Sequence, residues 1–406
     1  MVILQINAVN RKGSTGRTCK EMSEYINSQT DNTCLTAFAQ GIPGEFDFQI
    51  GDKFEWKAHA FFSRLTGKQA YFSRGGTRSL LEYIEEKKPD VVHLRNLHGN
   101  YINLKMLLRY LKKNRIPTVV TLHDCWFFTG KCTHYTVAGC DGWRKECGGC
   151  PKLKDDNASW LFDCTRKCLK DKKEFFASLD RLAVVGVSKW ITGEAEKSLL
   201  SCADIITTIY NWIDLDVFKY TADKSDVAVP DDGKKMILGV ASSWSDKKGL
   251  GDFIRLADML GDGYRIVLIG KMPEGTAVPE NVVCIESTGL ERVLAEYYSA
   301  ADVFVNLSPE ESFGKVSAEA LACGTPVVCF DSTANAELVP EGCGYVLPMG
   351  DLEGLTEAVK KAADTGREAY SEKCRAFAER EFDKVKQIEK YLKLYEDLTS
   401  AEVRNN

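Results

Sequence analysis

Residues 310–328 read EESFGKVSAEALACGTPVV, which is the most specific pattern in the chain. Two glutamates, Glu311 and Glu319, are separated by seven residues, and Gly314 lies between them. Apolar residues recur at helical spacing after Gly314, so the pattern predicts a short helix that carries Glu319. A glycine then ends the helix, and residues 325–330 are typical of a buried strand.

The junction between this loop and the expected helix suits a phosphorylated ligand. A helix N-terminus offers free N–H groups and the positive end of the helix dipole, and both favour a diphosphate. Glu319 is about five residues into the helix, or roughly 7–8 Å along its axis. If the phosphates bind at the start of the helix, a ribose would lie near this carboxylate.

The stretch resembles the E-x7-E signature of the retaining glycosyltransferases of family four, which have the GT-B fold. The resemblance implies that Glu311 is a catalytic residue that contacts the donor sugar and that Glu319 binds the ribose hydroxyls. It also implies that Phe313, Gly314 and Lys315 contact the sugar and phosphates of the donor. The spacing of the two glutamates alone fits a solvated acidic loop and an ordinary surface helix equally well.

A second loop, SSWSDKKG, begins at Ser242, follows an expected strand and opens an expected helix. In the resembled family this loop carries an arginine and a lysine that neutralise the donor diphosphate. Lys248 matches the lysine, but Ser243 occupies the arginine position. We expect Ser242 and Lys248 to bind the donor, and Lys247, Lys315 or a cation of the N-terminal domain to replace the missing charge, because a leaving diphosphate needs such stabilisation.

Size and composition indicate a soluble two-domain protein. The chain has 406 residues, more than one hydrophobic core usually serves. A net charge of −5 argues against a nucleic-acid partner. No apolar run is long enough to span a membrane. The N-terminal residues 1–7 are typical of a first strand and not of a signal peptide, so we expect a cytoplasmic protein with mostly reduced cysteines.

Strand-like and helix-like segments alternate along the chain, which predicts an α/β protein with parallel sheets. The resemblance implies a GT-B architecture of two Rossmann-like domains that face each other across a cleft. We expect an acceptor-binding domain at 1–208, with a Cys-rich insert at 125–168, and a nucleotide-sugar-binding domain at 209–385. A helical tail at 386–406 should cross back to the N-terminal domain. The expected strands are 2–8, 91–94, 118–122, 182–187, 235–240, 264–269 and 303–307, and the expected helices include 18–29, 104–114, 192–200, 250–260 and 290–299.

Several polar residues of the first half follow expected strands. Ligands of open α/β sheets gather at the carboxyl ends of the strands. His123 and Asp124 follow one strand, His98 follows another, and Gly13 lies in a glycine-containing loop after the first. The resemblance places this loop near the donor phosphates and the acceptor, His123 near the reacting sugar, and His98 and Asp124 on the acceptor side.

The mechanism that the resemblance implies retains the anomeric configuration. The acceptor hydroxyl attacks the face of the sugar that the diphosphate leaves, and the leaving phosphate can accept the proton. No strong protein base, metal ion or other cofactor is then required for catalysis. Glu311 would hydrogen-bond to the sugar hydroxyls.

Seven of the fifteen cysteines lie between Cys125 and Cys168. The densest set consists of Cys132, Cys140, Cys147 and Cys150. The set fits a structural zinc site, free thiols in an aromatic acceptor loop, or disulfides, which the cytoplasmic compartment disfavours. The whole insert resembles that of a subgroup of bacterial transferases that build exopolysaccharides of the colanic-acid type.

Residues 57–81 contain five cations and several aromatic residues but no acidic residue. Such mixtures favour anionic lipid headgroups. A solvated helix whose aromatic residues belong to the core is the alternative. An anionic membrane surface would fit an acceptor that is lipid-linked and held at the inner face of the plasma membrane.

The sequence therefore predicts transfer of a sugar from a nucleoside-diphosphate sugar to an acceptor hydroxyl. We expect the acceptor to be a lipid-linked saccharide in surface polysaccharide assembly. Two rival hypotheses remain. The first is a GT-B transferase that acts on a small soluble acceptor. The second is a catalytically silent module that binds nucleotide sugar, which is suggested by Ser243 and by Trp212 at a position where the family has glycine.

Overall fold

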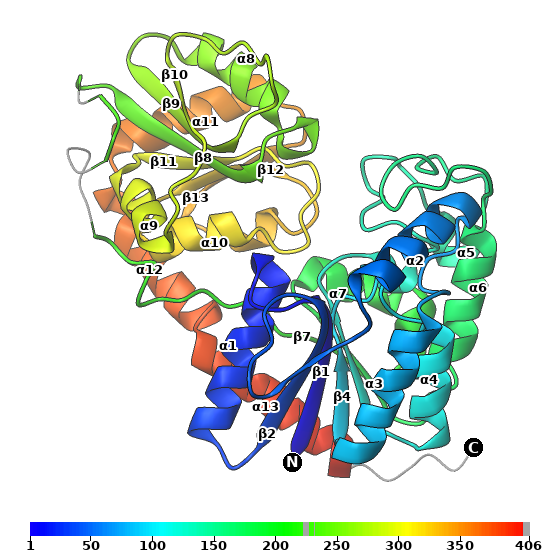
Figure 1. Cartoon of the computed structure of the whole chain (residues 1–406). Coiled ribbons are helices and arrows are strands. Elements are labelled where there is room, and N and C mark those ends of the chain that lie inside the picture. The colour runs from blue at the N-terminus through cyan, green and yellow to red at the C-terminus, as the bar shows by residue number, and fades with distance from the viewer. Residues whose placement is uncertain (222–226, 231, 401–406) are drawn as a thin grey trace. The chain divides into compact units, whose positions relative to one another are not determined.

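The computed structural model describes residues 1–221, 227–230 and 232–400. The last six residues of the predicted tail and parts of the segment after residue 221 therefore lie outside the described residues. The chain divides into two compact units (Figure 1). The N-terminal unit comprises Met1–Ile209 and Ile388–Asn406, and the C-terminal unit comprises Tyr210–Gln387.

The N-terminal unit is built on a seven-stranded parallel sheet in the order β3-β2-β1-β4-β5-β6-β7. Helices α1 and α13 lie on one face of the sheet, and α3, α4 and α6 lie on the other. The strands are β1 (Val2–Val9), β2 (Thr33–Gln40), β3 (Asp47–Gln49), β4 (Val91–Leu94), β5 (Thr118–Leu122), β6 (Leu182–Gly186) and β7 (Ile205–Thr208). The helices are α1 (Gly13–Gln29), α2 (Lys53–Thr66), α3 (Arg74–Lys87), α4 (Leu104–Lys113), α5 (Gly142–Lys145), α6 (Thr165–Phe176), α7 (Lys189–Glu196) and α13 (Lys384–Ser400).

The central strands of this sheet are buried because helices cover both faces. Every residue of β4, β5 and β6 is buried, and most of them are apolar, as is typical of parallel strands. Side-chain caps start several helices: Asp52 accepts from two N–H groups of α2, and Asn103 accepts from one of α4. These caps fix where the loops that follow the strands end and the helices begin.

The C-terminal unit contains a six-stranded parallel sheet in the order β10-β9-β8-β11-β12-β13. Helices α8 and α11 share one apolar core with β8, β9 and β11. The strands are β8 (Lys235–Ser243), β9 (Tyr264–Lys271), β10 (Val282–Ile285), β11 (Val303–Asn306), β12 (Val327–Asp331) and β13 (Gly344–Pro348). The helices are α8 (Leu250–Leu260), α9 (Glu291–Ala300), α10 (Lys315–Ala322), α11 (Leu352–Thr365) and α12 (Glu368–Glu381).

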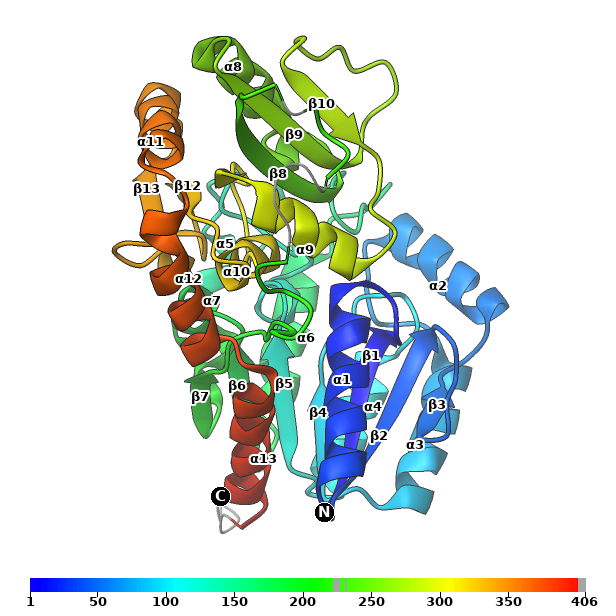
Figure 2. The same cartoon turned by 90° about the vertical axis from the view of Figure 1, so that its left-hand side faces the viewer.

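The last helix, α13, returns the chain to the N-terminal unit, as expected (Figure 2). The Tyr391 hydroxyl lies 3.0 Å from Thr121 Oγ1, and the Tyr395 hydroxyl lies 2.7 Å from His93 Nδ1. These tyrosines are buried, and their polar tips reach two central strands. His93 is thereby a core residue.

The secondary structure departs from the expectation in α7, and strands β2, β3, β7, β10 and β13 were not predicted. The helix expected at 192–200 begins earlier, because Ser188 caps the N–H of Ile191 and starts α7 at Lys189. The end of the expected helix is a separate 3₁₀ turn at Leu199–Cys202. The Cys-rich insert is largely irregular and contains the 3₁₀ turn Trp126–Phe128 and the short α5 before α6 begins.

Candidate donor and acceptor sites

In the C-terminal unit, the strand order reverses between β8 and β11. Loops at such a switch point usually form the ligand site of an open α/β sheet. The loop after β8 ends at Gly249, which has a φ of +72°. A Cβ atom at Gly249 would lie 2.5 Å from the carbonyl oxygen of Leu307, just after β11. Glycine therefore allows the two loops to approach each other closely.

The structure brings together Lys248 and Glu311 at this switch point. Lys248 Nζ lies 2.5 Å from Glu311 Oε1. Both side chains remain partly exposed, at 36% and 16%. A cation that can face phosphate and a carboxylate that can accept sugar hydroxyls are therefore available to a ligand at one place.

The backbone of Glu311 is fixed by the loop after β12. Glu311 N–H donates to Thr333 Oγ1 at 2.8 Å, and the Glu311 carbonyl accepts from Ala334 N–H at 3.2 Å. Thr333 has a φ of +48°, which is uncommon for a residue with a branched side chain. Asn335 continues this anchor by donating to the Ser308 carbonyl at 2.9 Å. Thr333 carries no motif and was missed by sequence reasoning.

Glu319 lies on α10, as predicted, but its side chain is more enclosed than a surface glutamate. The residue is 6% exposed. Tyr298 donates its hydroxyl to Glu319 Oε2 at 3.0 Å, and Lys315 Nζ lies 3.8 Å from Oε1. Lys315 lies one turn before Glu319 on the same helix. The negative charge of Glu319 is therefore partly balanced within α10.

Phe313 has a different place from the one that the motif suggested. Its ring is 3% exposed and packs against Tyr210 and Phe382, with ring centroids 6.1 Å and 5.4 Å away. Only the backbone of Phe313 and Gly314 is available to a donor. Gly314 has a φ of +84° and precedes α10 without a side-chain cap, so the first N–H groups of this helix have no capping side chain.

The position of the missing arginine lies at the edge of the β8–β9 ladder. Ser242 and Ser243 are both exposed. Ser243 is the register partner of Lys271, the last residue of β9, and Lys271 is also exposed. Register partners project to the same side of a sheet. Lys271 is therefore a cation beside the serine, and sequence reasoning missed it because the strand register is not readable from the sequence.

In the N-terminal unit, β1 is flanked by β2 and β4, and the strand order reverses there. Gly13 is the first residue of α1 after β1, with a φ of +62° and no atom within 4 Å of a built Cβ. His98 follows β4, and His123 and Asp124 follow β5. The fold therefore gathers four predicted residues at the carboxyl ends of three neighbouring strands.

His123 is held by Arg95, a buried residue that sequence reasoning missed. Arg95 Nε lies 3.4 Å from His123 Nε2, and its two terminal nitrogens donate to Gln5 Oε1 at 2.8 Å and Thr18 Oγ1 at 2.9 Å. Burial and the Arg95 charge lower the pKa of His123 to about 3. The imidazole is neutral, accepts at Nε2, and keeps its proton on Nδ1 as a donor.

His98 and Asp124 form a pair, with His98 Nε2 2.8 Å from Asp124 Oδ2. The N–H of Trp126 donates to the other carboxylate oxygen at 2.8 Å. Burial alone would raise the pKa of Asp124, but His98 and this N–H outweigh burial and hold the pKa below its ordinary value. Asp124 is therefore an ionised anchor for His98 and for the start of the insert.

Two buried lysines stabilise the Cys-rich insert by donating hydrogen bonds to its backbone carbonyls. Lys172 Nζ donates to the carbonyls of Trp126 at 2.5 Å and Thr129 at 2.9 Å. Lys131 Nζ donates to the carbonyls of Lys152 and Leu153 at 2.6 Å and 2.9 Å. Ammonium groups with several donors can satisfy the free carbonyls of an irregular loop.

All four cysteines of the predicted zinc set line one small cavity of about 30 Å³ in the insert. The thiols of Cys132 and Cys150 are hydrogen-bonded to each other. No group of three or more His, Cys, Asp or Glu side chains already stands in a metal-binding arrangement within residues 1–221, 227–230 and 232–400. The sulfur atoms share a cavity but would have to move to coordinate an ion.

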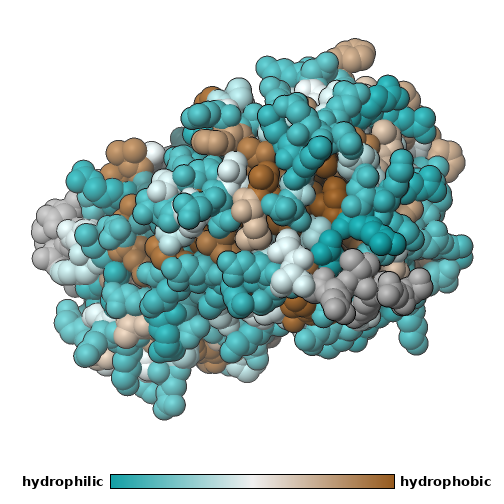
Figure 3. Space-filling model, turned by 90° about the horizontal axis from the view of Figure 1, so that it is seen from below, coloured by the Kyte–Doolittle hydropathy of each residue, from teal (hydrophilic) through white to brown (hydrophobic). Residues whose placement is uncertain are grey.

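Across the described residues, no helix is long and apolar enough to cross a bilayer. On the face shown in Figure 3, hydrophilic residues cover most of the surface and hydrophobic residues occur in separate groups.

Solved structures with this fold span nearly the whole chain. Sucrose-phosphate synthase from Thermosynechococcus elongatus matches with a TM-score of 0.68 and 15% identity, covering 99% of this chain and all of the other. Anabaena HepE in complex with UDP matches with a TM-score of 0.66 and 16% identity, covering 98% of this chain and all of the other. Two Rossmann-like sheets with a returning C-terminal helix therefore define a protein of the GT-B fold.

Family models match both units. The model described as Glycosyltransferase Family 4 matches residues 17–217, and the model described as Glycosyl transferases group 1 matches residues 234–365. The chain belongs to the family 4 glycosyltransferases.

Curated relatives include transferases named for colanic acid biosynthesis and for the O-antigen chain. WcaC of Escherichia coli, named for colanic acid biosynthesis, is 27% identical over 322 residues, which are 76% of this chain and 77% of WcaC. The O-antigen chain mannosyltransferase RfbU of Salmonella typhimurium is 26% identical over 214 residues, which are 50% of this chain and 57% of RfbU.

Proposed function

We propose that the protein transfers a sugar, with retention of anomeric configuration, from a nucleoside-diphosphate sugar to an acceptor hydroxyl. The observation that carries this proposal is the Lys248–Glu311 pair at the switch point of the C-terminal sheet. In a complex, Lys248 would turn from the carboxylate to the diphosphate, and Glu311 would accept hydrogen bonds from the sugar hydroxyls. Glu319 would bind the ribose, and the backbone at residues 313–315 would face the phosphates.

The second cation of the donor site is proposed to be Lys271. Ser243 provides no charge, and Lys315 already faces Glu319. Lys271 is exposed at the carboxyl end of β9 and is paired in register with Ser243. Two cations on a diphosphate stabilise the leaving group without a metal ion, so we propose a metal-independent reaction.

In the N-terminal unit, His123 is proposed to hold the reacting sugar by donating from Nδ1. A pKa of about 3 leaves this imidazole uncharged at neutral pH, so it cannot act as a strong acid there. The leaving phosphate then takes the proton of the acceptor hydroxyl. Gly13 leaves room for a ligand at the start of α1, and His98 with Asp124 would orient the acceptor.

The acceptor is proposed to be a saccharide in bacterial surface polysaccharide assembly, carried on a lipid at the cytoplasmic face of the membrane. The names of WcaC and RfbU, together with the cations and aromatic residues of 57–81, support this class. A small soluble acceptor remains the alternative within the enzyme class.

Thermal-shift screening with UDP, GDP and ADP and their sugars tests the donor proposal, since a ligand that binds the native state raises its melting temperature. We expect one nucleotide class to stabilise the protein and its sugar to be hydrolysed or transferred slowly. Tight nucleotide binding without any turnover would instead support the silent module.

A structural zinc ion at the four cysteines is a separate proposal, and it has no role in the reaction. The support is that Cys132, Cys140, Cys147 and Cys150 line one cavity within an irregular loop. Metal analysis of protein purified under reducing conditions should find about one zinc per chain. A Cys147→Ser, Cys150→Ser variant should lose it, and a Cys202→Ser variant should retain it. Substoichiometric zinc in the unmodified protein would contradict the zinc site and indicate that the four cysteines are free thiols.

A further inference from the structure

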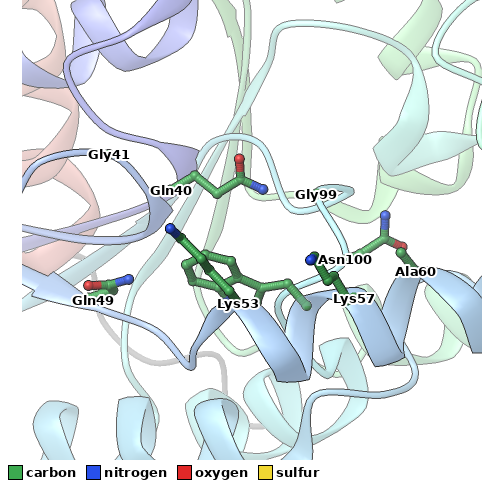
Figure 4. Close-up of a pocket in the computed structure, with 9 residues that line it drawn as sticks. Gln40, Gly41, Gln49, Lys53, Lys57, Ala60, Gly99 and Asn100 are labelled. Carbon is green, nitrogen blue, oxygen red and sulfur yellow. The ribbon is translucent and has the colours of Figure 1, made fainter.

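A cavity of about 410 Å³ lies in the N-terminal unit beside α2. It is lined by the last residue of β2, the loop after β4, and the side of α2 that carries Lys53, Trp56, Lys57 and Ala60. These four residues follow the i, i+3, i+4, i+7 spacing of one helix face. Figure 4 shows Lys53 and Lys57 rising from α2 toward Gln40 and Asn100.

The lining of this cavity is suited to a sugar next to an anion. Gln40, Gln49 and Asn100 provide amide donors and acceptors, and Trp56 provides an aromatic wall. The Trp56 indole N–H already donates to the Ile50 carbonyl at 2.9 Å, which fixes the ring. Aromatic rings and amides are the groups that a saccharide can stack on and hydrogen-bond with.

The two lysines are available to a ligand. Within residues 1–221, 227–230 and 232–400, neither Lys53 nor Lys57 makes a hydrogen bond or an ion pair. The nearby carboxylates are already engaged. Asp52 accepts from the N–H groups of Phe54 and Glu55, and Glu55 accepts from the N–H groups of Gly75 and Gly76. Neither carboxylate lines the cavity, whose lining contains two lysines and no acidic residue, so the charge of the lining is positive.

An adjacent side of the same helix is apolar and exposed. Phe54, Phe61 and Phe62 are 82%, 49% and 45% exposed. Phe61 meets Trp160 at a ring distance of 5.9 Å, and Trp160, Leu161 and Phe162 are also exposed. Helices with an apolar strip beside cations bind at the headgroup level of a membrane. A soluble acidic sugar would have no apolar part to contact this strip.

We propose that the cavity receives the phosphate-bearing end of a lipid-linked saccharide. Lys53 and Lys57 bind the phosphate, the amides and Trp56 hold the first sugar, and Phe54, Phe61 and Phe62 enter the membrane beside the lipid chain. The inference rests on the proposed transfer to a lipid-linked acceptor and names the chemistry by which that acceptor is recognised. Lysine suits this role because it binds phosphate as a point charge.

Sedimentation of the full chain with phosphatidylcholine vesicles tests the proposal. One set of vesicles carries a polyprenyl diphosphate, and a second carries phosphatidylglycerol at equal charge. We expect stronger binding to the first set and a loss of about tenfold or more for the Lys53→Gln, Lys57→Gln variant. A Phe54→Ser, Phe61→Ser variant should bind both sets more weakly. A Lys112→Gln, Lys113→Gln variant, which changes exposed charges at the end of α4, should bind as the unmodified protein does.

Two outcomes would overturn the proposal. Equal binding to both vesicle sets would show that the surface attracts anionic headgroups in general and does not recognise the polyprenyl diphosphate. Displacement by inorganic pyrophosphate together with full binding of the phenylalanine variant would indicate a soluble phosphate ligand. Nucleotide-induced thermal shifts, measured on every variant, report on folding and on the donor site. Intact shifts with no vesicle binding would refute this inference and leave the proposed transferase activity standing.

Discussion

At the scale of single residues, the proposed donor site depends on a small number of charges. Lys248 and Glu311 form an ion pair, so a donor would have to replace this contact with contacts to its own phosphate and hydroxyl groups. Once Lys248 faces the diphosphate, its positive charge would stabilise the negative charge that develops on the leaving group.

Removal of one cation at this site should weaken donor binding in a graded way. A charge-assisted hydrogen bond contributes about 1.5–3 kcal/mol, so Lys248→Gln should weaken nucleoside-diphosphate binding about tenfold to a hundredfold. Lys271→Gln should weaken it about tenfold on the same grounds. Arg255→Gln removes an exposed cation on α8 of the same unit and serves as the control. Calorimetric titration measures all three, and equal affinities for Lys271→Gln and the control would remove Lys271 from the donor site.

Sequence motifs predicted residues that the structure brings together, whereas residues that only three-dimensional neighbours define were missed. Glu311 and Lys248 were predicted from two separate motifs, and the structure joins them. Arg95 was missed because its partner Gln5 is 90 residues away in sequence. Phe313 lies within the motif, but a sequence does not show that its ring turns into an aromatic cluster with Tyr210 and Phe382.

At the scale of elements, the loop after β8 depends on one backbone conformation. Gly249 ends the 3₁₀ turn Asp246–Lys248 and starts α8 with a positive φ. The strands that were predicted are mostly buried on both faces and consist of continuous apolar runs. Strand β2 was not predicted, because Thr33–Gln40 mixes threonine, cysteine and alanine with few large apolar residues.

Replacement of Gly249 by alanine should destabilise this loop and displace Lys248. The new Cβ would lie 2.5 Å from Leu307 O in a left-handed conformation, which costs about 1–2 kcal/mol before any clash is counted. Gly251, two residues later in α8, has no atom within 4 Å of a built Cβ. Gly251→Ala should therefore stabilise the helix by up to about 1 kcal/mol. Thermal melting of both variants gives the comparison, and equal melting temperatures would contradict the strain at Gly249.

At the scale of the whole molecule, buried neutral histidines of the N-terminal unit link stability to pH. Burial lowers the pKa of His59 to about 4, and burial with Arg95 lowers the pKa of His123 to about 3. Burial also places the pKa of His93 well below its ordinary value. The unfolded chain would bind protons at about pH 6.5, where the folded chain does not.

The N-terminal unit should therefore lose stability on acidification. Below about pH 6.5 the unfolded state gains protons first, so the free energy of unfolding falls by up to about 1.4 kcal/mol per pH unit for each histidine, down to each folded pKa. Above about pH 6.5 these groups are neutral in both states and contribute no slope. Denaturant unfolding between pH 7 and about pH 5 measures this slope. His59→Gln should make the slope shallower, and an unchanged slope would contradict the role of His59.

Turnover by a Glu311→Gln variant tests the central proposal most directly. The variant keeps the size of the side chain but removes the carboxylate that is proposed to hold the sugar. We expect kcat/KM for the nucleoside-diphosphate sugar to fall about a hundredfold or more, since a charged hydrogen bond in the transition state contributes roughly 3 kcal/mol. Binding of the nucleoside diphosphate itself should persist, because Lys248 remains. Near-normal turnover by a correctly folded variant would contradict the proposed donor site.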